Sequence, residues 1–509
     1  MRSSGGSRRL SPWACGRLTP TVLLGVACAS SFSFLLGYDI GIMSGAKRLI
    51  KKDFDLGEGE LELLVGILNL ISGPGGLLSG RLADSLGRRP SAALACLITI
   101  IGALLMATAG SFGVILTGRV ITGVGVGCCF HVAPLYLAEI SPKQVRGKLV
   151  SCFDLFINIG ILAGFIVGYA LAPPAGASAA EGSTAWRWML GLGAIPPALI
   201  LVGLIFLPES PRFLVAAGNE REARQVLSTI YTSEEADATI ETLRGERRET
   251  KPLSLLAGLR RVFFPAKGAP RALMMAGLGC AFWQQATGVE AAVYYTPETL
   301  EAAGIADEGL LLLATVGIGV VKVAFIILAA CIVEHVGRVK LLLASNVGMG
   351  IAQLMLGLSF SFNERLIPLA LSGQALFMAA FSIGAGPCSM MVASELFPLQ
   401  VRGFALGVAT LINRVTSGTV ALTFLSMSRV LTPSGAYFMF AGLAACAFTF
   451  IGRYVPETKG KSLEEIERTL TERFSAGPGV PREVAIVDSL EMAPSSNGAL
   501  QVKVESETV

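Results

Sequence analysis

The sequence predicts an all-α membrane protein with twelve transmembrane helices, arranged as two halves of six. Three observations support this fold class: the composition, the number of long apolar segments and an internal repeat. Hydrophobic residues make up 52% of the 509-residue chain and charged residues only 15%, whereas an average soluble protein is about 25% charged. The composition therefore argues against a soluble enzyme, a nucleic-acid-binding module and a disordered protein.

Transmembrane helices of about 20 mostly apolar residues are expected at twelve places along the chain. Six fall in an N-terminal half covering 21–208 and six in a C-terminal half covering 271–456. The expected spans are 21–45, 61–81, 91–110, 112–138, 148–172, 187–207, 271–296, 309–333, 340–361, 366–394, 402–428 and 433–455. The apolar run from Val22 is long enough to be a retained first helix rather than a cleaved signal.

Three polar segments lie outside these spans: a tail at 1–20, a linker at 209–270 and a second tail at 457–509. In the linker, charged runs that begin at Glu220 and at Ala238 predict short solvent-facing helices. The second tail has a helical pattern from Ser462 and then becomes polar. All three segments are expected in the cytoplasm.

The positions of lysine and arginine in the loops predict the orientation. Basic residues gather on the side that carries the linker, and the loops at 110–112, 173–186 and 297–308 contain none. The linker side is therefore expected to be cytoplasmic. The loop expected at 46–60 disagrees, because it should face outside and yet contains Lys47, Arg48, Lys51 and Lys52.

Three local patterns occur twice, in the same order and at nearly constant spacing. They are Gly80–Arg89 with Ile332–Arg338, Glu139–Gly147 with Glu395–Gly403, and Pro208–Arg212 with Pro456–Gly460. An even number of spans in each half makes the repeats parallel, related by an axis along the membrane normal.

Each repeated pattern falls where a span meets the cytoplasm, which predicts a belt of charges that gates this side. Asp84, Glu139, Glu209 and Glu395 are expected to pair with Arg88, Arg146, Arg212 and Arg402, and Arg89 and Arg338 belong to the same patterns. The alternative is that these charges only fix the topology and anchor the helices.

Neither a metal site nor an enzyme is indicated. Most of the ten cysteines stand singly in apolar runs, no C-x-x-C pair occurs, and the two histidines, His131 and His335, are far apart. No nucleophile or cofactor motif is present, so we expect no cofactor other than a coupling proton.

Six charged residues lie within the expected spans, where an ionisable group is costly and is a functional candidate. They are Asp39, Arg119, Asp154, Glu290, Lys322 and Arg414. Counting along their helices places both Asp39 and Arg119 in the outer half of the membrane, where they could meet. A carboxylate beside an arginine stays ionised, and a desolvated one without that partner favours its protonated form. The pair therefore suggests proton coupling, with a static buried ion pair as the alternative.

Several stretches resemble the sugar porter family of the major facilitator superfamily, and within it the plant-type polyol and monosaccharide proton symporters. The resemblance covers roughly Thr21 to Glu465 and is most specific at Leu36–Ala46, Phe282–Glu290, Gly319–Phe325 and Asn413–Gly418. It implies a symporter that works by alternating access, with Asp39 as the proton site and Arg119 as its modulator. A facilitative uniporter and a transporter-like sugar sensor remain as alternatives.

The resemblance also implies the substrate site. Gln284, Gln285 and Asn413 match amides that bind hexose hydroxyls in the family. Asp154, Glu290 and Lys322 replace amides of the hexose carriers and resemble the polyol type, although Glu290 and Lys322 could instead neutralise each other. Asn158 shares a helix face with Asp154, and Met390 stands where the family usually has tryptophan.

The remaining expectations concern gates, partners and location. Gly384 and Pro387 are expected to break the tenth span so that it acts as a gate, and Tyr294 and Tyr295 to form an outer gate or simply to pack. The expected partners are a polyol or monosaccharide, protons and the lipid bilayer, without nucleic acid. The protein is expected to act as a monomer in the plasma membrane.

Overall fold

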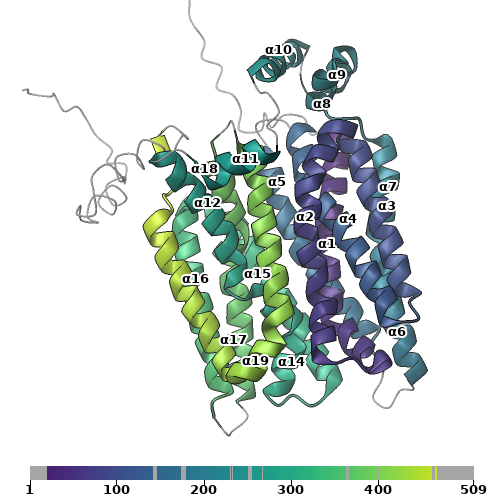
Figure 1. Cartoon of the computed structure of the whole chain (residues 1–509), viewed down its shortest axis with the longest axis vertical. Helices are drawn as coiled ribbons and strands as arrows, with labels where there is room; N and C mark the ends of the chain where they lie inside the picture. Colours follow the sequence, from purple (N-terminus) through teal and green to yellow (C-terminus); the bar gives the residue numbers. More distant parts are fainter. Residues whose placement is uncertain are drawn as a thin grey trace, which may run out of the picture.

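The computed structural model describes residues 20–140, 146–173, 179–229, 231, 233–249, 255–265, 268–362, 366–398, 401–460 and 465–466. All regular secondary structure in these ranges is helical. The long helices run side by side, and the short helices α8 to α11 lie over one end of them (Figure 1). We call this the linker end and the other the opposite end. The expected tail at 1–20, except Pro20, and nearly all of the second tail after Gly460 lie outside the described residues.

The N-terminal half and the linker follow the expected order of spans and short helices. The half contains α1 (Pro20–Phe54), α2 (Glu58–Leu86), α3 (Arg88–Ala107), α4 (Phe112–Ile140), α5 (Arg146–Ala170), α6 (Ala179–Gly191), η1 (Leu192–Ala194) and α7 (Ile195–Phe206). The linker contains α8 (Pro211–Ala217), α9 (Glu220–Ser228), α10 (Ser233–Glu249) and α11 (Leu255–Phe263).

The C-terminal half contains more breaks. Its elements are α12 (Ala269–Ala286), α13 (Val289–Tyr294), α14 (Thr296–Ala302), α15 (Glu308–Val336), α16 (Arg338–Ser359), α17 (Ile367–Ala380), the π-helical η2 (Phe381–Ala385), α18 (Gly386–Leu396) and α19 (Arg402–Tyr454). Gly288, in the left-handed region at φ 90°, separates α12 from α13. Thr432, at φ 66°, divides α19 into two helices at the opposite end.

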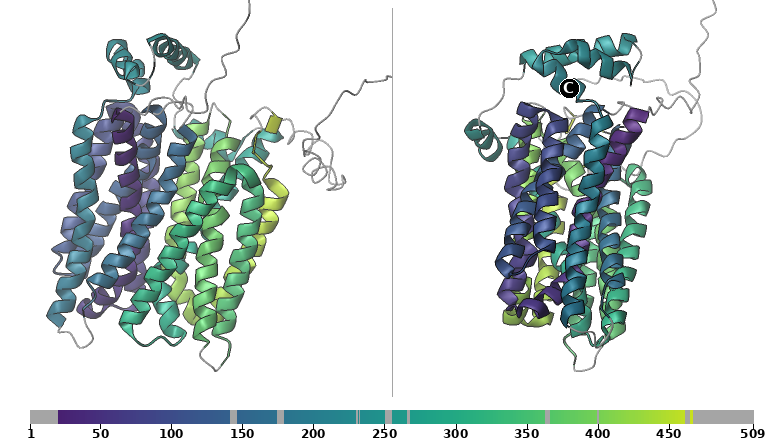
Figure 2. Two further views of the ribbon diagram at one scale, coloured as in Figure 1. Left: turned by 180° about the vertical axis from the view of Figure 1, so that it is seen from behind. Right: turned by 90° about the vertical axis from the view of Figure 1, so that its right-hand side faces the viewer.

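Ten helices in the described ranges are long and apolar enough to cross a membrane. One of them, α19, contains the last two expected spans, and the expected span at 271–296 is the broken pair α12 and α13. The helices thus account for all twelve expected passes. The two halves stand next to each other as separate bundles (Figure 2).

The expected boundary between the first two spans was wrong. The segment 46–60 is not an extended loop, because α1 continues to Phe54 and α2 begins at Glu58. Lys47, Arg48, Lys51 and Lys52 therefore lie on the last two turns of α1.

Backbone contact between α1 and α5 positions three of the candidate residues. A Cβ atom built on Gly37 would lie 1.9 Å from the Ile157 carbonyl oxygen, and one built on Gly160 would lie 2.2 Å from the Phe34 carbonyl oxygen. Glycine is therefore required on both helices for this approach, as at other close helix contacts in membranes. The contact holds Asp39 on α1 close to the segment of α5 that carries Asp154 and Asn158.

The internal repeat is visible at the linker end as the same helix cap in both halves. The Glu209 carboxylate accepts hydrogen bonds from the backbone amides of Arg88 (2.9 Å) and Arg89 (3.1 Å) at the start of α3. The Glu457 carboxylate accepts them from the amides of Arg338 (3.0 Å) and Val339 (3.1 Å) at the start of α16. Each cap satisfies free amides and places negative charge at the positive end of a helix.

This cap yields a stability prediction. Glu209→Gln removes the charge and turns one acceptor into a donor facing amide hydrogens. We expect a loss of about 1–2 kcal/mol in the free energy of unfolding. In detergent, the thermal midpoint should fall by a few degrees. Glu241→Gln on the exposed face of α10 is the control and should leave the midpoint unchanged; equal midpoints for both variants would contradict the capping role.

Candidate functional site

A cavity lies between the two halves and brings the predicted substrate residues together. Its empty volume is about 730 Å³. All eight predicted substrate residues line it: Asp154, Asn158, Gln284, Gln285, Glu290, Lys322, Met390 and Asn413. Its wall also includes Phe130, Phe381 and Arg414, for which sequence reasoning gave no substrate role.

The amides in this cavity form an internal network. Asn413 Nδ2 donates to Gln284 Oε1 (2.7 Å) and to the Ala281 carbonyl (3.0 Å). Asn413 Oδ1 accepts from Gln285 Nε2 (3.3 Å) and from Arg414 Nε and Nη2 (3.1 and 2.9 Å). Gln284 Nε2 donates to two carbonyls at the junction of η2 and α18, those of Ala385 (3.0 Å) and Gly386 (2.7 Å). Most amide atoms expected to bind hydroxyls are thus already occupied within the protein.

The charged residues of the cavity are less constrained. Glu290 accepts a hydrogen bond from Ser417 Oγ at 2.8 Å. The Lys322 ammonium lies 5.6 Å from the centre of the Phe381 ring. Within the described part of the chain, no carboxylate comes within 4.0 Å of the Lys322 nitrogen. Glu290 and Lys322 therefore do not form a direct ion pair, and their mutual neutralisation remains the alternative to substrate binding.

Asp39 and Arg119 form a buried ion pair, as the sequence suggested. Arg119 Nη1 lies 2.8 Å from both carboxylate oxygens of Asp39, and the two side chains are 0% and 9% exposed. Arg119 Nε and Nη2 donate to the carbonyls of Leu64 and Val65. The guanidinium is thus held by α2, and it donates to both oxygens of the Asp39 side chain.

The Asp39 carboxylate does not line the central cavity. Asp39 lines a separate, smaller cavity within the N-terminal half, together with Tyr38, Thr99 and Thr122. Its neighbours on α1, Leu36 and Ile40, line the central cavity. Helix α1 is therefore a common wall, with the carboxylate on one side and the substrate cavity on the other.

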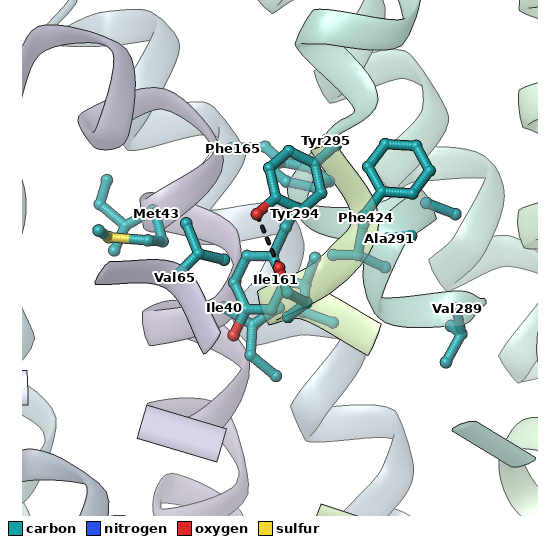
Figure 3. Close-up of a cluster of buried hydrophobic side chains, with 14 of the residues drawn as sticks. Ile40, Met43, Val65, Ile161, Phe165, Val289, Ala291, Tyr294, Tyr295 and Phe424 are labelled. Carbon is teal, nitrogen blue, oxygen red and sulfur yellow. Dashed lines mark hydrogen bonds between the residues drawn. The ribbon is translucent and has the colours of Figure 1, made fainter. Parts of the chain in front are cut away.

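The predicted outer-gate tyrosines lie at a polar contact between the halves. Lys47 is completely buried, and its ammonium donates to the Tyr294 carbonyl and to Glu298, both at 2.8 Å. The same ammonium lies 3.9 Å from the centre of the Tyr295 ring. Asn69 Nδ2 donates to the Tyr294 hydroxyl at 3.2 Å. Figure 3 shows both tyrosine rings in the apolar cluster that surrounds this contact.

Further ion pairs surround this contact and provide partners for Arg48 and Lys52 at the end of α1. Arg48 and Lys52 face Glu301 and Glu308 across the interface, Glu58 pairs with Arg429, and Glu62 accepts from Ser426. Among the described residues, the hydrogen bonds and ion pairs that join the two halves all lie between the central cavity and the opposite end. In this conformation the halves are joined by polar contacts at that end.

At the linker end, the predicted charge belt consists of pairs within each half. Arg88 pairs with Asp84 (3.2 Å) and Glu139 (2.9 Å). The corresponding Arg338 pairs with Glu334 (3.2 Å) and Glu395 (3.6 Å).

Four predicted gating residues make other contacts. Glu209 caps α3, Arg89 Nη2 donates to the Ile205 carbonyl, Arg402 Nε donates to the Phe397 carbonyl, and the Arg212 amide donates to Ser210 Oγ. Arg402 therefore does not make the expected pair with Glu395, because its side chain turns to cap the preceding turn. The Arg146 side chain lies outside the described residues.

The tenth span is not broken as expected, because Ile367–Leu396 runs as one helix that contains a π-helical segment. The π-helical segment η2 precedes α18, which has Pro387 in its first turn. A Cβ atom on Gly384 would lie 2.2 Å from the Leu341 carbonyl oxygen, so glycine allows η2 to approach α16 closely. Since π-bulges often mark functional segments of helices, this π-helical segment is a candidate hinge.

Sequence reasoning missed several residues that the structure places at these contacts. Lys47 and Glu298 join the halves, and Glu334 and Glu457 complete the repeated charge pattern. The last two could have been found, because both occur inside the repeated patterns. Lys47 had no such signal, since its partner lies on another half.

Two helical bundles with a cavity between them, lined by polar and charged side chains, are the arrangement of secondary transporters. The fold is that of the major facilitator superfamily. The chain belongs to the sugar transporter family, since the family described as "Sugar (and other) transporter" matches residues 25–470.

Known proteins similar to the chain include plant and bacterial transporters. The "Probable polyol transporter 4" of Arabidopsis thaliana is 40% identical over 449 residues, covering 87% of this chain and 84% of that protein. The "Glucose transporter GlcP" of Staphylococcus epidermidis is 36% identical, covering 87% and 96%. Among solved structures, the proton:xylose symporter XylE bound to 6-bromo-6-deoxy-D-glucose has a TM-score of 0.75 at 28% identity, covering 88% of this chain and 99% of that one.

Proposed function

We propose that this protein is a proton-coupled symporter of polyols and monosaccharides that works by alternating access. The similar polyol and glucose transporters and the proton:xylose symporter support this function. The proposal includes a location in the plasma membrane, activity as a monomer, and two moving bodies that correspond to 21–208 and 271–456. The arginines Arg88, Arg89 and Arg338 at the linker end favour a cytoplasmic position for that end and for both termini.

With this orientation, the structure is closed towards the outside. Lys47, Glu298 and the surrounding pairs join the halves there, and Asp39 is paired with Arg119. Such a state fits the stage after substrate and proton have left towards the cytoplasm. Once the empty protein has reopened to the outside, protonation of Asp39 from that side would weaken its contact with Arg119 and allow α1 to move. The pairs of Arg88 and Arg338 would hold the cytoplasmic helix ends of each half together during this motion.

The observation that carries the proposal is the position of the Asp39 side chain, which lies on the face of α1 that points away from the central cavity. The small cavity beside Asp39 and the central cavity are separate, and residues of α1 line both. A proton therefore has no need to touch the substrate in order to affect it, because a shift of α1 changes the wall of the cavity. Coupling between two sites through an element with two arrangements is the general requirement for linked binding.

Uptake into vesicles tests the proposed function. The purified protein would be reconstituted, and labelled D-glucitol and D-glucose would be offered with and without a pH gradient, acidic outside. We expect concentrative uptake of at least one of them only with the gradient. Uptake that equilibrates at the same rate with and without the gradient would instead support a uniporter, in which Asp39 and Arg119 form a static pair.

A further inference from the structure

Arg414 is the buried charge of the central cavity to which neither the sequence nor the proposed function assigns a task. It lies on α19, is 7% exposed and lines the cavity. Its Nε and Nη2 both donate to Asn413 Oδ1, so the side chain is fixed by the amide network. Its Nη1 has no hydrogen-bond partner.

An unpaired guanidinium nitrogen at a buried position is costly, and the cavity contains a complementary group. Gln285 Oε1 is also buried and without a partner, although Gln285 Nε2 donates to the same Asn413 oxygen. The network thus leaves one donor, Arg414 Nη1, and one acceptor, Gln285 Oε1, without a hydrogen-bond partner, on two side chains that both bind Asn413 Oδ1. A hydroxyl group both accepts and donates, so a chain of hydroxyls on neighbouring carbons would satisfy both atoms.

The aromatic residues of the cavity are covered by cations. The Arg414 guanidinium lies 5.2 Å from the centre of the Phe130 ring, and the Lys322 ammonium 5.6 Å from the centre of the Phe381 ring. These two are the aromatic side chains in the described lining of the cavity. A pyranose ring presents a C–H face that packs on an exposed aromatic ring, whereas an open-chain polyol presents hydroxyls along its whole length. The arrangement of the cavity fits the second shape better.

We propose that Arg414 contacts the substrate and makes the central site selective for open-chain polyols over pyranose sugars. The assignment rests on the proposed transport function. Arg414 Nη1 donates to hydroxyl oxygens of the polyol. The guanidinium lies over the Phe130 ring and so prevents a sugar ring from stacking on it. Asn413 is a positioning residue in this account, because its side-chain oxygen holds the Arg414 guanidinium in place.

The test compares D-glucitol with D-glucose, two six-carbon compounds of which one is open and the other mostly a ring. The variants are Arg414→Gln and Arg414→Lys, with Val415→Ala on the exposed side of the same helix as control. We expect Arg414→Gln to raise the KM for D-glucitol about tenfold or more, as for a lost hydrogen bond to a charged donor. The KM for D-glucose should stay the same or fall, because Phe130 becomes accessible.

Arg414→Lys keeps the charge but cannot make two hydrogen bonds to Asn413 while covering Phe130. It should therefore lose the preference for D-glucitol as well, and it provides the comparison if Arg414→Gln is not recovered in folded form. A KM ratio in these variants within twofold of the unmodified protein would overturn the assignment of Arg414 alone. An unmodified protein that transports neither compound would overturn the proposed function, and the assignment with it.

Discussion

Asp39→Asn is expected to abolish concentrative uptake while leaving downhill transport measurable. Asparagine has nearly the same shape as aspartate but cannot take up and release a proton. With one proton per substrate, a gradient of one pH unit allows about tenfold accumulation. The variant should reach equal concentrations inside and outside at any gradient. The experiment measures the final accumulation of labelled D-glucitol in vesicles of the unmodified protein and the variant.

The control for this variant is Asp55→Asn. Asp55 is exposed between α1 and α2 and has a positive φ of 49°, a conformation that asparagine tolerates well. It should accumulate substrate like the unmodified protein. If Asp39→Asn still accumulated substrate in response to the pH gradient, Asp39 would not be the proton site, and its contact with Arg119 would be purely structural.

Lys47→Met is expected to have the second large effect, by weakening the closure at the opposite end. The ammonium of Lys47 binds a carbonyl and a carboxylate of the other half, and it is fully buried. Removing one partner of a fully buried pair costs about 3–5 kcal/mol. Since Glu298 is 24% exposed, we expect about 2 kcal/mol here. The population open at this end should then rise about 30-fold, and the transport rate should fall because closure becomes limiting.

Accessibility of a buried residue near this contact measures the shift. Val65 is fully buried in the apolar cluster around Tyr294 (Figure 3), so Val65→Cys should react with an impermeant thiol reagent only when the halves separate. Reaction should be faster when Lys47→Met is added. Lys52→Met is the control, because Lys52 is 67% exposed and its partner lies 3.8 Å away. Equal labelling in all three backgrounds would contradict a closing role for Lys47.

Much of the fold could be predicted from the sequence, because the signals are local. Apolar runs of sufficient length mark the spans, and repeated patterns such as Glu139–Gly147 and Glu395–Gly403 mark the relation of the halves. The breaks were harder to locate. The end of α1 was misplaced because its cluster of basic residues resembles a polar loop. These residues can belong to a helix because acidic residues of α14 and α15, across the interface, pair with them.

In the candidate site, too, local sequence predicts some features, and contacts between distant segments decide the others. Membership of the cavity follows from helix register and family motifs, and all eight predicted residues line it. Which of their atoms remain free depends on contacts between distant segments. Asn413 meets Gln284, Gln285 and Ala281 only through the packing of α19 on α12. For that reason, the sequence suggested Asn413 as a ligand and left Arg414 unassigned, whereas the geometry points to Arg414 as the free donor.

The central claim is that substrate and proton move together, and proton movement driven by substrate tests it most directly. Vesicles with equal pH on both sides and a pH-sensitive dye inside would receive D-glucitol outside, with a permeant ion to prevent charge build-up. Coupling is reciprocal, so the interior should become acidic as D-glucitol enters, and Asp39→Asn should abolish this change. Entry of labelled D-glucitol without any acidification of the interior would contradict the account.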